Sequence, residues 1–400
     1  MALSLIISAV FPPEPIVSAN LSKDLAEALS EMNEVKVLSP IPSRPYGFKF
    51  DQKTNPKLPF QHIILASYTC PQSSIIGRFR ESYSFGKTTE RHIHEHHDKI
   101  DRIYANTWPL LAQYFTVKAA KKYKLPIVIH VQDIYPESLA NKLPFIGPLV
   151  NYLLRPMDAW ILRNATRVIA ISQKMEDYLI KTRKLNPSHI EVVINWQDEK
   201  PFLHFQENNI LPGKDTPFTF MYLGNIGPVA GCDLLLEVFS SLDTKNRKLV
   251  IAGSGSVKDK LIKQVNDQKV SNVEFIPVPD GKVPETQALA DILILPIKKG
   301  AASTSIPSKL PAYMFSAKPI IATVDYDSDT ANAIREAGCG WVVEPEQPEA
   351  LADLIQNVQG MPKTELIAMG YRGREYALQH FSKKNNLSKL VGIIEGLMKQ

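Results

Sequence analysis

The run Phe218-Thr-Phe-Met-Tyr-Leu-Gly224-Asn-Ile-Gly227-Pro-Val-Ala-Gly231-Cys-Asp-Leu-Leu-Leu-Glu237 decides the fold class. It reads as a buried strand, a glycine-punctuated turn and an amphipathic helix. Glycines let the backbone approach an anion closely, and the free N–H groups at the start of the helix favour negative charge. The turn is therefore a candidate phosphate cradle, although such turns also occur for structural reasons alone.

A second strand and glycine turn follow in Leu249-Val-Ile-Ala-Gly253-Ser-Gly255-Ser, which leads into a helix expected over Val257–Val265. Neither turn matches a P-loop or a G-x-G-x-x-G fingerprint. Two such turns in one strand–helix–strand unit nevertheless favour a nucleotide-shaped pocket.

Apolar runs alternate with helical patterns along the whole chain. Runs without polar alternation suit strands that are covered on both faces, as in parallel sheets with crossover helices. A polar, proline-containing stretch over 196–215 separates two such series. We therefore expect an α/β fold with two facing, Rossmann-like, doubly wound domains and a ligand cleft at the carboxyl ends of their strands. The expected strands are Leu3–Val10, Val35–Leu38, Ile63–Leu65, Ile127–Val131, Val168–Ile171, Val192–Ile194, Phe218–Leu223, Lys248–Ile251, Val273–Ile276, Ile292–Leu295, Pro319–Val324 and Gly340–Val343.

The composition is that of a globular protein, with 400 residues of which 44% are hydrophobic and 22% are charged. It excludes a disordered or fibrous chain. The longest apolar runs fall short of the roughly 20 residues that a transmembrane helix needs. No basic residue precedes Leu3–Val10, so we expect a first strand there and no secretory signal. Three widely spaced cysteines offer no disulfide framework and no metal-ligand spacing, which fits a reducing cytoplasm.

The positive charge lies in the first half of the chain. Residues 1–200 hold 25 Lys and Arg against 19 Asp and Glu, whereas residues 201–400 hold 21 against 22. Such an excess can attract an anionic ligand or an anionic membrane surface, and a solvated surface explains it equally well. It is too mild to indicate nucleic-acid binding.

The loop after the strand at 292–295 combines small and cationic residues in Lys298-Lys299-Gly-Ala-Ala-Ser-Thr-Ser-Ile-Pro307-Ser308-Lys309. Pro307 favours a helix start. There, the Ser308 hydroxyl and the Lys309 ammonium beside exposed N–H groups could hold a diphosphate. A solvent-exposed lysine is the alternative interpretation.

A strand of the first half ends in ionisable groups, in Ile127-Val-Ile-His130-Val-Gln-Asp133-Ile-Tyr-Pro-Glu137. His130 can change its charge near neutral pH, and a carboxylate two or three residues later could orient it or bind a sugar hydroxyl. A hydrogen-bonded, purely structural histidine is the alternative.

Two other segments suggest binding sites more weakly. The four histidines of Arg91-His92-Ile-His94-Glu95-His96-His97-Asp98 have partly helical spacing but no further ligand set, so we expect no metal. Apolar residues precede lysines in Trp108–Lys124, which could contact a membrane. A helix that packs on the sheet and carries lysines in its last turn explains that segment as well.

With these pieces in place, the chain resembles the retaining family-4 glycosyltransferases of GT-B architecture, in particular the bacterial exopolysaccharide and O-antigen enzymes related to colanic-acid and N-acetylfucosamine transferases. The resemblance covers nearly the whole chain. It rests on Phe11-Pro-Pro-Glu14, His130-Val-Gln-Asp133, Asn195-Trp196-Gln-Asp198, Gly224-Asn-Ile-Gly227, Gly253-Ser-Gly255, Gly300-Ala-Ala and Pro307-Ser308-Lys309-Leu310.

The resemblance implies a nucleotide-sugar donor, usually a UDP-sugar, bound by a domain over 216–375. It implies a saccharide or polyprenyl-diphosphate-linked acceptor bound by a domain over 1–200, to which a helix over about 376–400 returns. A metal cofactor is not expected. The residues it assigns are Gly224, Asn225, Gly227, Gly253, Gly255, Ser308 and Lys309 to the donor nucleotide, Glu14 and Glu137 to the acceptor, and His130, Asp133 and Lys309 to catalysis.

The chain departs from the broad family at two places. Thr304 and Ala312 stand where the family has two glutamates, and neither can act as a carboxylate. Asn225 and Ala230 replace the usual Arg and Lys of the first glycine loop, so Lys309, helped by Lys298 or Lys299, has to supply the cation.

Breaking the bond between the anomeric carbon and the phosphate builds negative charge on the leaving diphosphate, which cations and helix N-termini stabilise. No nucleophile stands out, which favours front-face attack. We therefore expect a retaining transferase of cell-surface polysaccharide synthesis, cytoplasmic and bound peripherally to the inner face of the membrane. A UDP-sugar epimerase of the same fold and a non-catalytic scaffold subunit are the alternatives.

Overall fold

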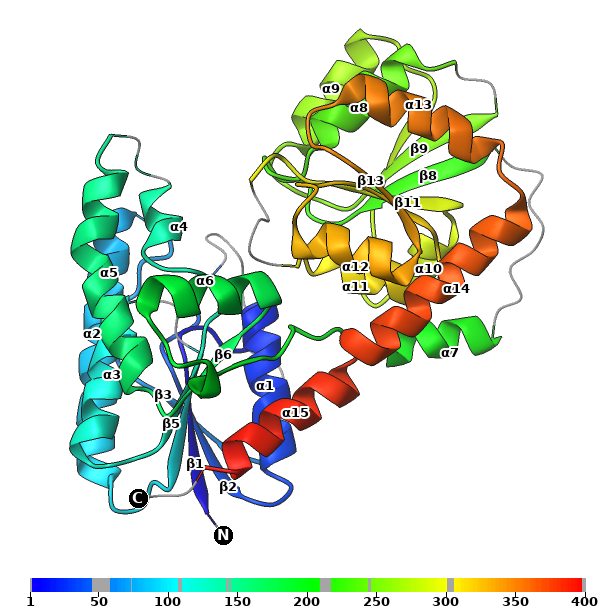
Figure 1. The fold of residues 1–400 in the computed structure, drawn as a ribbon. Helices are drawn as coiled ribbons and strands as arrows, with labels where there is room; N and C mark the ends of the chain where they lie inside the picture. Colours follow the sequence, from blue (N-terminus) through cyan, green and yellow to red (C-terminus); the bar gives the residue numbers. More distant parts are fainter. Residues whose placement is uncertain are drawn as a thin grey trace. The chain divides into compact units, whose positions relative to one another are not determined.

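The computed structural model describes residues 2–44, 58–72, 74–106, 110–141, 143, 145–208, 217–243, 246–300 and 306–397. The chain divides into two compact units, Met1–Asn195 with Asn386–Gln400 and Trp196–Asn385. Each unit contains one parallel sheet covered by helices (Figure 1). The expectation of two Rossmann-like α/β domains is confirmed.

The sheet of the first unit has the strand order β3-β2-β1-β4-β5-β6-β7, and neighbouring strands are parallel. The order reverses direction at β1, as in doubly wound folds. The strands are β1 Leu3–Ser8, β2 Glu34–Ser39, β3 Gln61–Ile64, β4 Arg102–Asn106, β5 Ile127–His130, β6 Arg167–Ala170 and β7 Ile190–Val192. The helices are α1 Val17–Leu29, α2 Ile75–His96, α3 Leu110–Lys122, α4 Glu137–Ala140, α5 Gly147–Asn164, α6 Gln173–Arg183 and α15 Lys383–Glu395.

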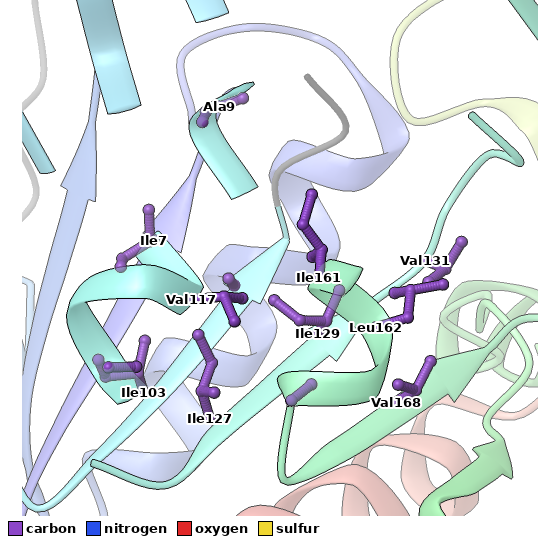
Figure 2. Close-up of a cluster of buried hydrophobic side chains, with 14 of the residues drawn as sticks. Ile7, Ala9, Ile103, Val117, Ile127, Ile129, Val131, Ile161, Leu162 and Val168 are labelled. Carbon is purple, nitrogen blue, oxygen red and sulfur yellow. The ribbon is translucent and has the colours of Figure 1, made fainter. Parts of the chain in front are cut away.

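Alternate residues of the central strands build the core of this unit. Ile7, Ile103 and Ile129 come from three neighbouring strands, and they pack with Val117 of α3 and Ile161 of α5 (Figure 2). All five are almost completely buried. Burial of such a side chain stabilises the fold by about 1.5–3 kcal/mol, so this apolar layer fixes the register of the sheet.

The sequence analysis did not anticipate β4, which lies beside β1 in the middle of the sheet. Its sequence, Arg102-Ile-Tyr-Ala-Asn106, begins and ends in polar residues that are nevertheless buried. The Arg102 guanidinium donates to Ser4 (2.9 Å), to Asn33 (2.6 Å) and to the Ile394 carbonyl of α15 (3.2 Å). These bonds offset the cost of burying the charge, and only the tertiary structure provides them.

The sheet of the second unit has the order β10-β9-β8-β11-β12-β13, again with parallel neighbours. Each of its strands lies where the apolar runs predicted it, within about two residues, a typical error at element ends. The strands are β8 Phe218–Leu223, β9 Arg247–Ala252, β10 Val273–Ile276, β11 Ile292–Pro296, β12 Ile320–Thr323 and β13 Gly340–Val343. The helices are α7 Lys200–Asn208, α8 Cys232–Ser241, α9 Lys258–Asp267, α10 Val283–Ala288, α11 Lys309–Phe315, α12 Asp329–Ala337, α13 Pro348–Gln359 and α14 Lys363–His380.

The boundaries between the units differ from the expected ones at 200 and 376. The first unit ends at Asn195, and the chain returns to it at Asn386. The reason is that α14 packs against α11 and α12 of the second unit, so the crossover begins only within α15. The Lys389 ammonium of α15 then donates to the Val192 carbonyl (2.8 Å) at the end of β7.

None of the helices in the described ranges is long and apolar enough to span a bilayer. For the segment Trp108–Lys124, the structure supports the alternative in which a helix packs on the sheet. Trp108 lies outside the described residues, while Leu110 and Val117 of α3 are buried in the core. The apolar side of α3 is therefore used for packing against the sheet.

Candidate active site

The two glycine turns of the second unit lie against each other at the carboxyl edge of the sheet. They follow the adjacent strands β8 and β9, and the Gly224 N–H donates to the Ala252 carbonyl (3.0 Å). A Cβ added to Gly253 would lie 2.1 Å from the Gly224 carbonyl oxygen, and one added to Gly255 would lie 2.3 Å from that of Ile226. Both distances are far below contact distance, so the closeness of the two turns depends on glycine.

We expect Gly253→Ala to lower the free energy of unfolding by about 2–4 kcal/mol, because the methyl group clashes with backbone and φ is +133° at this position. Denaturant unfolding measures the change. Gly392→Ala in α15 is the matched control, since nothing lies within 4 Å of its added Cβ. A Gly253→Ala protein as stable as the control would show that the turns can separate without cost.

Lys309, the first residue of α11, lies across the first glycine turn. Its Cε would be 2.1 Å from a Cβ on Gly224, so the side chain fills the space that the glycine leaves. Its ammonium lies 5.6 Å from the centroid of the Tyr222 ring. Burial lowers the pKa of Lys309, and the nearby Cys232 opposes the shift. No carboxylate in the described part of the chain pairs with this ammonium, which leaves a partly desolvated cation available to an anion.

Tyr313 fixes α11 to the end of β8. Its hydroxyl donates to the Leu223 carbonyl (2.9 Å) and accepts from the Leu223 N–H (2.8 Å). Tyr313 lies one helical turn after Lys309 on α11, so the same anchor positions the lysine. The sequence analysis missed Tyr313, because an aromatic residue in an apolar helix signals only core packing.

Other polar groups surround the paired turns. Ser308 is exposed and its hydroxyl makes no capping bond to α11, so that hydroxyl is not committed to the helix. Lys258, which the sequence analysis did not select, donates to the Gly253 carbonyl (2.9 Å). Lys298 instead forms an exposed ion pair with Asp233 (2.8 Å). Of the lysines named here, Lys309 and Lys258 therefore lie at the turns.

In the first unit, His130 ends β5 and is buried within a hydrogen-bonded chain of side chains. The Asn195 amide donates to Gln132 Oε1 (2.7 Å), which directs the Gln132 NH₂ group towards His130 Nε2 (3.0 Å). That nitrogen must then accept, so the ring proton lies on Nδ1 and faces the Tyr104 oxygen (2.7 Å). Tyr104 and Gln132 therefore orient His130, the role considered for a nearby carboxylate; Asp133 is exposed in the following loop.

Burial lowers the pKa of His130 to about 3. The unfolded chain takes up a proton at this residue near pH 6.5 and the folded protein resists it, so stability falls as the pH decreases below 6.5. Between pH 7 and pH 5, the free energy of unfolding should therefore fall by about 2 kcal/mol less in His130→Gln than in the wild type. Urea unfolding at both pH values measures this. His189→Gln, at an exposed site, is the control; equal pH dependence in all three proteins would contradict the assignment.

Glu14 is buried in the loop after β1, with 3% of its surface exposed. Its carboxylate accepts from the N–H groups of Ser43 (2.7 Å) and Arg44 (2.8 Å). Burial raises the pKa of Glu14, and the bond from Ser43 opposes this shift. The carboxylate thus joins the loop after β1 to the segment that follows β2, and its role towards an acceptor stays a prediction.

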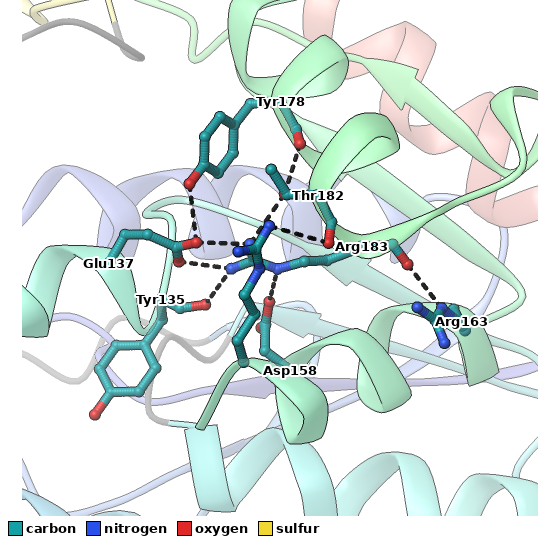
Figure 3. Close-up of polar contacts among 8 residues, drawn as sticks. Tyr135, Glu137, Asp158, Arg163, Tyr178, Thr182 and Arg183 are labelled. Carbon is teal, nitrogen blue, oxygen red and sulfur yellow. Dashed lines mark hydrogen bonds and ion pairs between the residues drawn. The ribbon is translucent and has the colours of Figure 1, made fainter. Parts of the chain in front are cut away.

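Glu137, the other residue assigned to the acceptor, is engaged by the completely buried Arg183 (Figure 3). Arg183 donates to both oxygens of Glu137 (2.6 and 2.7 Å) and to Asp158 (2.6 Å), and the Tyr178 hydroxyl also donates to Glu137 (2.9 Å). These bonds tie α4, α5 and α6 together. These bonds give the Glu137 carboxylate a structural role. Its role towards an acceptor stays a prediction.

The histidine cluster occupies the last turns of α2. His92 and His96 stack with their ring centroids 4.3 Å apart, and His96 Nδ1 lies 2.9 Å from the His92 carbonyl oxygen. The described residues contain no group of three or more His, Cys, Asp or Glu side chains that could hold a metal ion. All three cysteines are free and buried.

Two family models divide the chain at almost the same place as the fold does. The model described as Glycosyltransferase Family 4 matches residues 19–199, and the model described as Glycosyl transferases group 1 matches residues 205–391. The chain carries the two domains of a GT-B glycosyltransferase. The interlocked glycine turns and Lys309 belong to the group 1 domain, and His130 and Glu14 are in the first unit.

Relatives and solved structures agree with this assignment. The glycosyltransferase domains are 24% identical over 318 residues to the probable glycosyltransferase WbjE of Pseudomonas aeruginosa, covering 75% of this chain and 76% of that protein. They are 26% identical to the putative colanic acid biosynthesis glycosyl transferase WcaI of Escherichia coli (strain K12), covering 67% of each. The crystal structure of Anabaena Alr3699/HepE in complex with UDP superimposes with a TM-score of 0.71 at 16% identity, covering 99% and 100% of the chains, which shows the shared fold.

Of the two positions at which the resemblance places glutamates in the broad family, Thr304 lies outside the described residues. Ala312 is the fourth residue of α11 and is buried beside Tyr313. Its methyl group has no acid–base chemistry, so the described part of this helix contributes a cation through Lys309 and no carboxylate.

Proposed function

We propose that the enzyme transfers a sugar from a UDP-sugar to a saccharide or polyprenyl-diphosphate-linked acceptor, with retention of anomeric configuration. One observation carries the proposal: the partly buried Lys309 ammonium lies over the Gly224 turn without a paired carboxylate in the described residues. A diphosphate supplies the missing negative charge, and glycine backbone allows it to approach.

The choice of donor is supported by a structural neighbour. Anabaena Alr3699/HepE, which has the same fold, was crystallised with UDP and also with UDP and glucose. Retention comes from the family resemblance, and the front-face route from the lack of an evident nucleophile in the sequence. In that route the leaving diphosphate develops negative charge as the glycosidic bond breaks, and Lys309 with the Ser308 hydroxyl stabilises it.

The first unit is proposed to hold the acceptor. Two of its buried polar residues, Glu14 and His130, lie near the carboxyl ends of β1 and β5, where parallel sheets place ligands. His130 is neutral, and a sugar hydroxyl would bond its Nε2 by taking the place of the Gln132 amide, while exposed Asp133 can accept from other hydroxyls of the acceptor.

The biological setting is proposed from the names of the relatives. WcaI is described as an enzyme of colanic acid biosynthesis, so we infer a role in cell-surface polysaccharide synthesis. Such acceptors are often carried on lipids, and the first half of the chain carries the excess of positive charge. We therefore also propose action from the cytoplasm at the inner face of the cell membrane, without a metal cofactor.

A thermal-shift panel with UDP, GDP, ADP, CMP and dTDP tests the donor assignment. A nucleotide at 100 times its dissociation constant adds about 2.7 kcal/mol to the stability of the folded protein. We expect selective stabilisation by UDP. Stabilisation by a different nucleotide would mean that the donor carries that nucleotide instead of UDP. No response to any of them would favour a scaffold subunit over a transferase.

A further inference from the structure

The outer face of α5 is apolar where a surface helix is normally polar. Its inner side chains, such as Ile161 and Leu162, are buried in the core of the first unit. Tyr152 and Leu153 on the outer side are 77% and 63% exposed. We call the exposed residues of this face and of the turn before it the α5 ridge: Phe145, Ile146, Leu149, Tyr152 and Leu153. A continuous exposed apolar face on a helix marks an interaction surface.

Phe145 stands at the tip of the ridge in a conformation that costs energy. Its φ is +57°, in the left-handed region that non-glycine residues rarely adopt, and its side chain is completely exposed. Packing of the Phe145 ring within this unit does not offset the cost of that backbone conformation, because the ring is surrounded by solvent. A partner that buries the protruding Phe145 ring would offset this cost.

The charge around the ridge identifies the chemistry of this partner. Between Glu137 and Asp158 the sequence contains no Asp or Glu, and its charged residues are Lys142 and Arg155. Arg155 is half-buried, and Arg163, further along α5, is exposed. In the described part of α5 the charged side chains at the surface are the cations Arg155 and Arg163, while Asp158 is buried against Arg183, and an apolar ridge beside such cations complements acyl chains under anionic headgroups.

The segment below the ridge is held rigidly. The Gly147 N–H donates to the Leu143 carbonyl (2.9 Å), and a Cβ on Gly147 would lie 2.3 Å from the Ala140 carbonyl oxygen, so α4 and α5 meet tightly. Arg183 joins both helices to α6 through Glu137 and Asp158 (Figure 3). The exposed side chains therefore project from a fixed support rather than from a loose loop.

We propose that the α5 ridge inserts into the surface of a bilayer that contains anionic phospholipids. The inference rests on the proposed function, because a lipid-linked acceptor requires the enzyme to work at a membrane. It places the contact on α5 instead of on α3, whose Leu110 and Val117 are buried in the core. A protein partner is the alternative outcome of the test. It would have to present carboxylates to Arg155 and a pocket to Phe145.

Sedimentation with vesicles of phosphatidylcholine and phosphatidylglycerol, and with vesicles of phosphatidylcholine alone, measures the contact with the full chain. We expect binding to the mixed vesicles that weakens at high salt. The variant Phe145→Ser/Leu149→Ser/Leu153→Ser should lower the partition coefficient about tenfold or more. The matched control, Ile367→Ser/Tyr371→Ser, removes exposed apolar side chains from α14 of the other unit and should bind like the wild type.

Equal vesicle binding by the ridge variant and the wild type, or no binding by either, would overturn the proposal. A wild-type dimer that the ridge substitutions dissociate, without vesicle binding, would assign the ridge to self-association instead. Thermal stabilisation by UDP, measured on the same proteins, reports separately on the proposed function. A UDP response without vesicle binding refutes the membrane contact alone, whereas vesicle binding without a UDP response refutes the donor assignment alone.

Discussion

Lys309→Ala should weaken UDP binding by about 10- to 100-fold, because a charge-assisted contact to the diphosphate contributes roughly 1.5–3 kcal/mol. The transfer rate should fall further, by about 10²–10³-fold, since the charge on the leaving diphosphate is greatest in the transition state. Isothermal titration with UDP and steady-state kinetics with the UDP-sugar measure the two effects. The protein should keep its fold, because Lys309 makes no hydrogen bond or ion pair with the described residues.

Lys298→Ala is the matched control for this experiment. Lys298 lies near the start of the loop that follows β11, and Lys309 lies directly after the end of that loop. The charge of Lys298 is already neutralised by Asp233 on the surface. Its removal should change UDP affinity by less than about threefold, in line with the small free energies of exposed ion pairs. Equal losses in the two variants would mean that general positive potential attracts the nucleotide, and the specific role of Lys309 would be wrong.

Arg183→Met should lower the free energy of unfolding by about 3–5 kcal/mol. Methionine fills most of the volume, but the buried Asp158 and the half-buried Glu137 then remain without their cation. Urea unfolding measures the loss. The exposed neighbour Lys181→Met should change stability by less than about 0.5 kcal/mol. The triple variant Arg183→Met/Glu137→Gln/Asp158→Asn should recover much of the loss, because it removes the uncompensated charges as well.

The loss in Arg183→Met should depend on pH. Burial raises the pKa of Asp158 to about 6, against the lowering effect of Arg183, so removing Arg183 raises it further. A carboxyl group with a raised pKa in the folded state stabilises the fold below its unfolded pKa, and this contribution disappears as the pH rises through the folded value. The deficit should therefore be smaller at pH 5 than at pH 8. A deficit independent of pH would show that lost packing, not charge, dominates.

The strands of the second unit could be predicted from sequence because they are continuous apolar runs bounded by glycine or polar residues. Phe218–Leu223 is an example, since its apolar run coincides with β8. β4 could not be found in this way. Arg102 and Asn106 make its ends look exposed, and they are buried only because Ser4, Asn33 and Ser22 from distant parts of the chain bond them.

The candidate donor site likewise has residues that the sequence indicates and contacts that it does not. Local sequence identified Gly224, Gly253 and Lys309, because glycine after a strand and a cation after a helix-starting proline have local physical meanings. The sequence did not indicate that Lys309 lies directly over Gly224. It also did not indicate Tyr313, whose bonds to Leu223 join α11 to β8 across 90 residues of chain.

The sequence by itself determined the two α/β domains, the positions of the glycine turns and the residue types available for anion binding. These follow from periodicity and from backbone freedom, which act over a few residues. Only the tertiary structure decided which ionisable groups have partners. It gave Arg183 to Glu137 and Asp158, oriented His130 through Tyr104 and Gln132, and left Lys309 without a carboxylate in the described residues. The reason is that desolvation and pairing depend on groups brought together from distant parts of the chain, and short-range sequence patterns do not encode those distances.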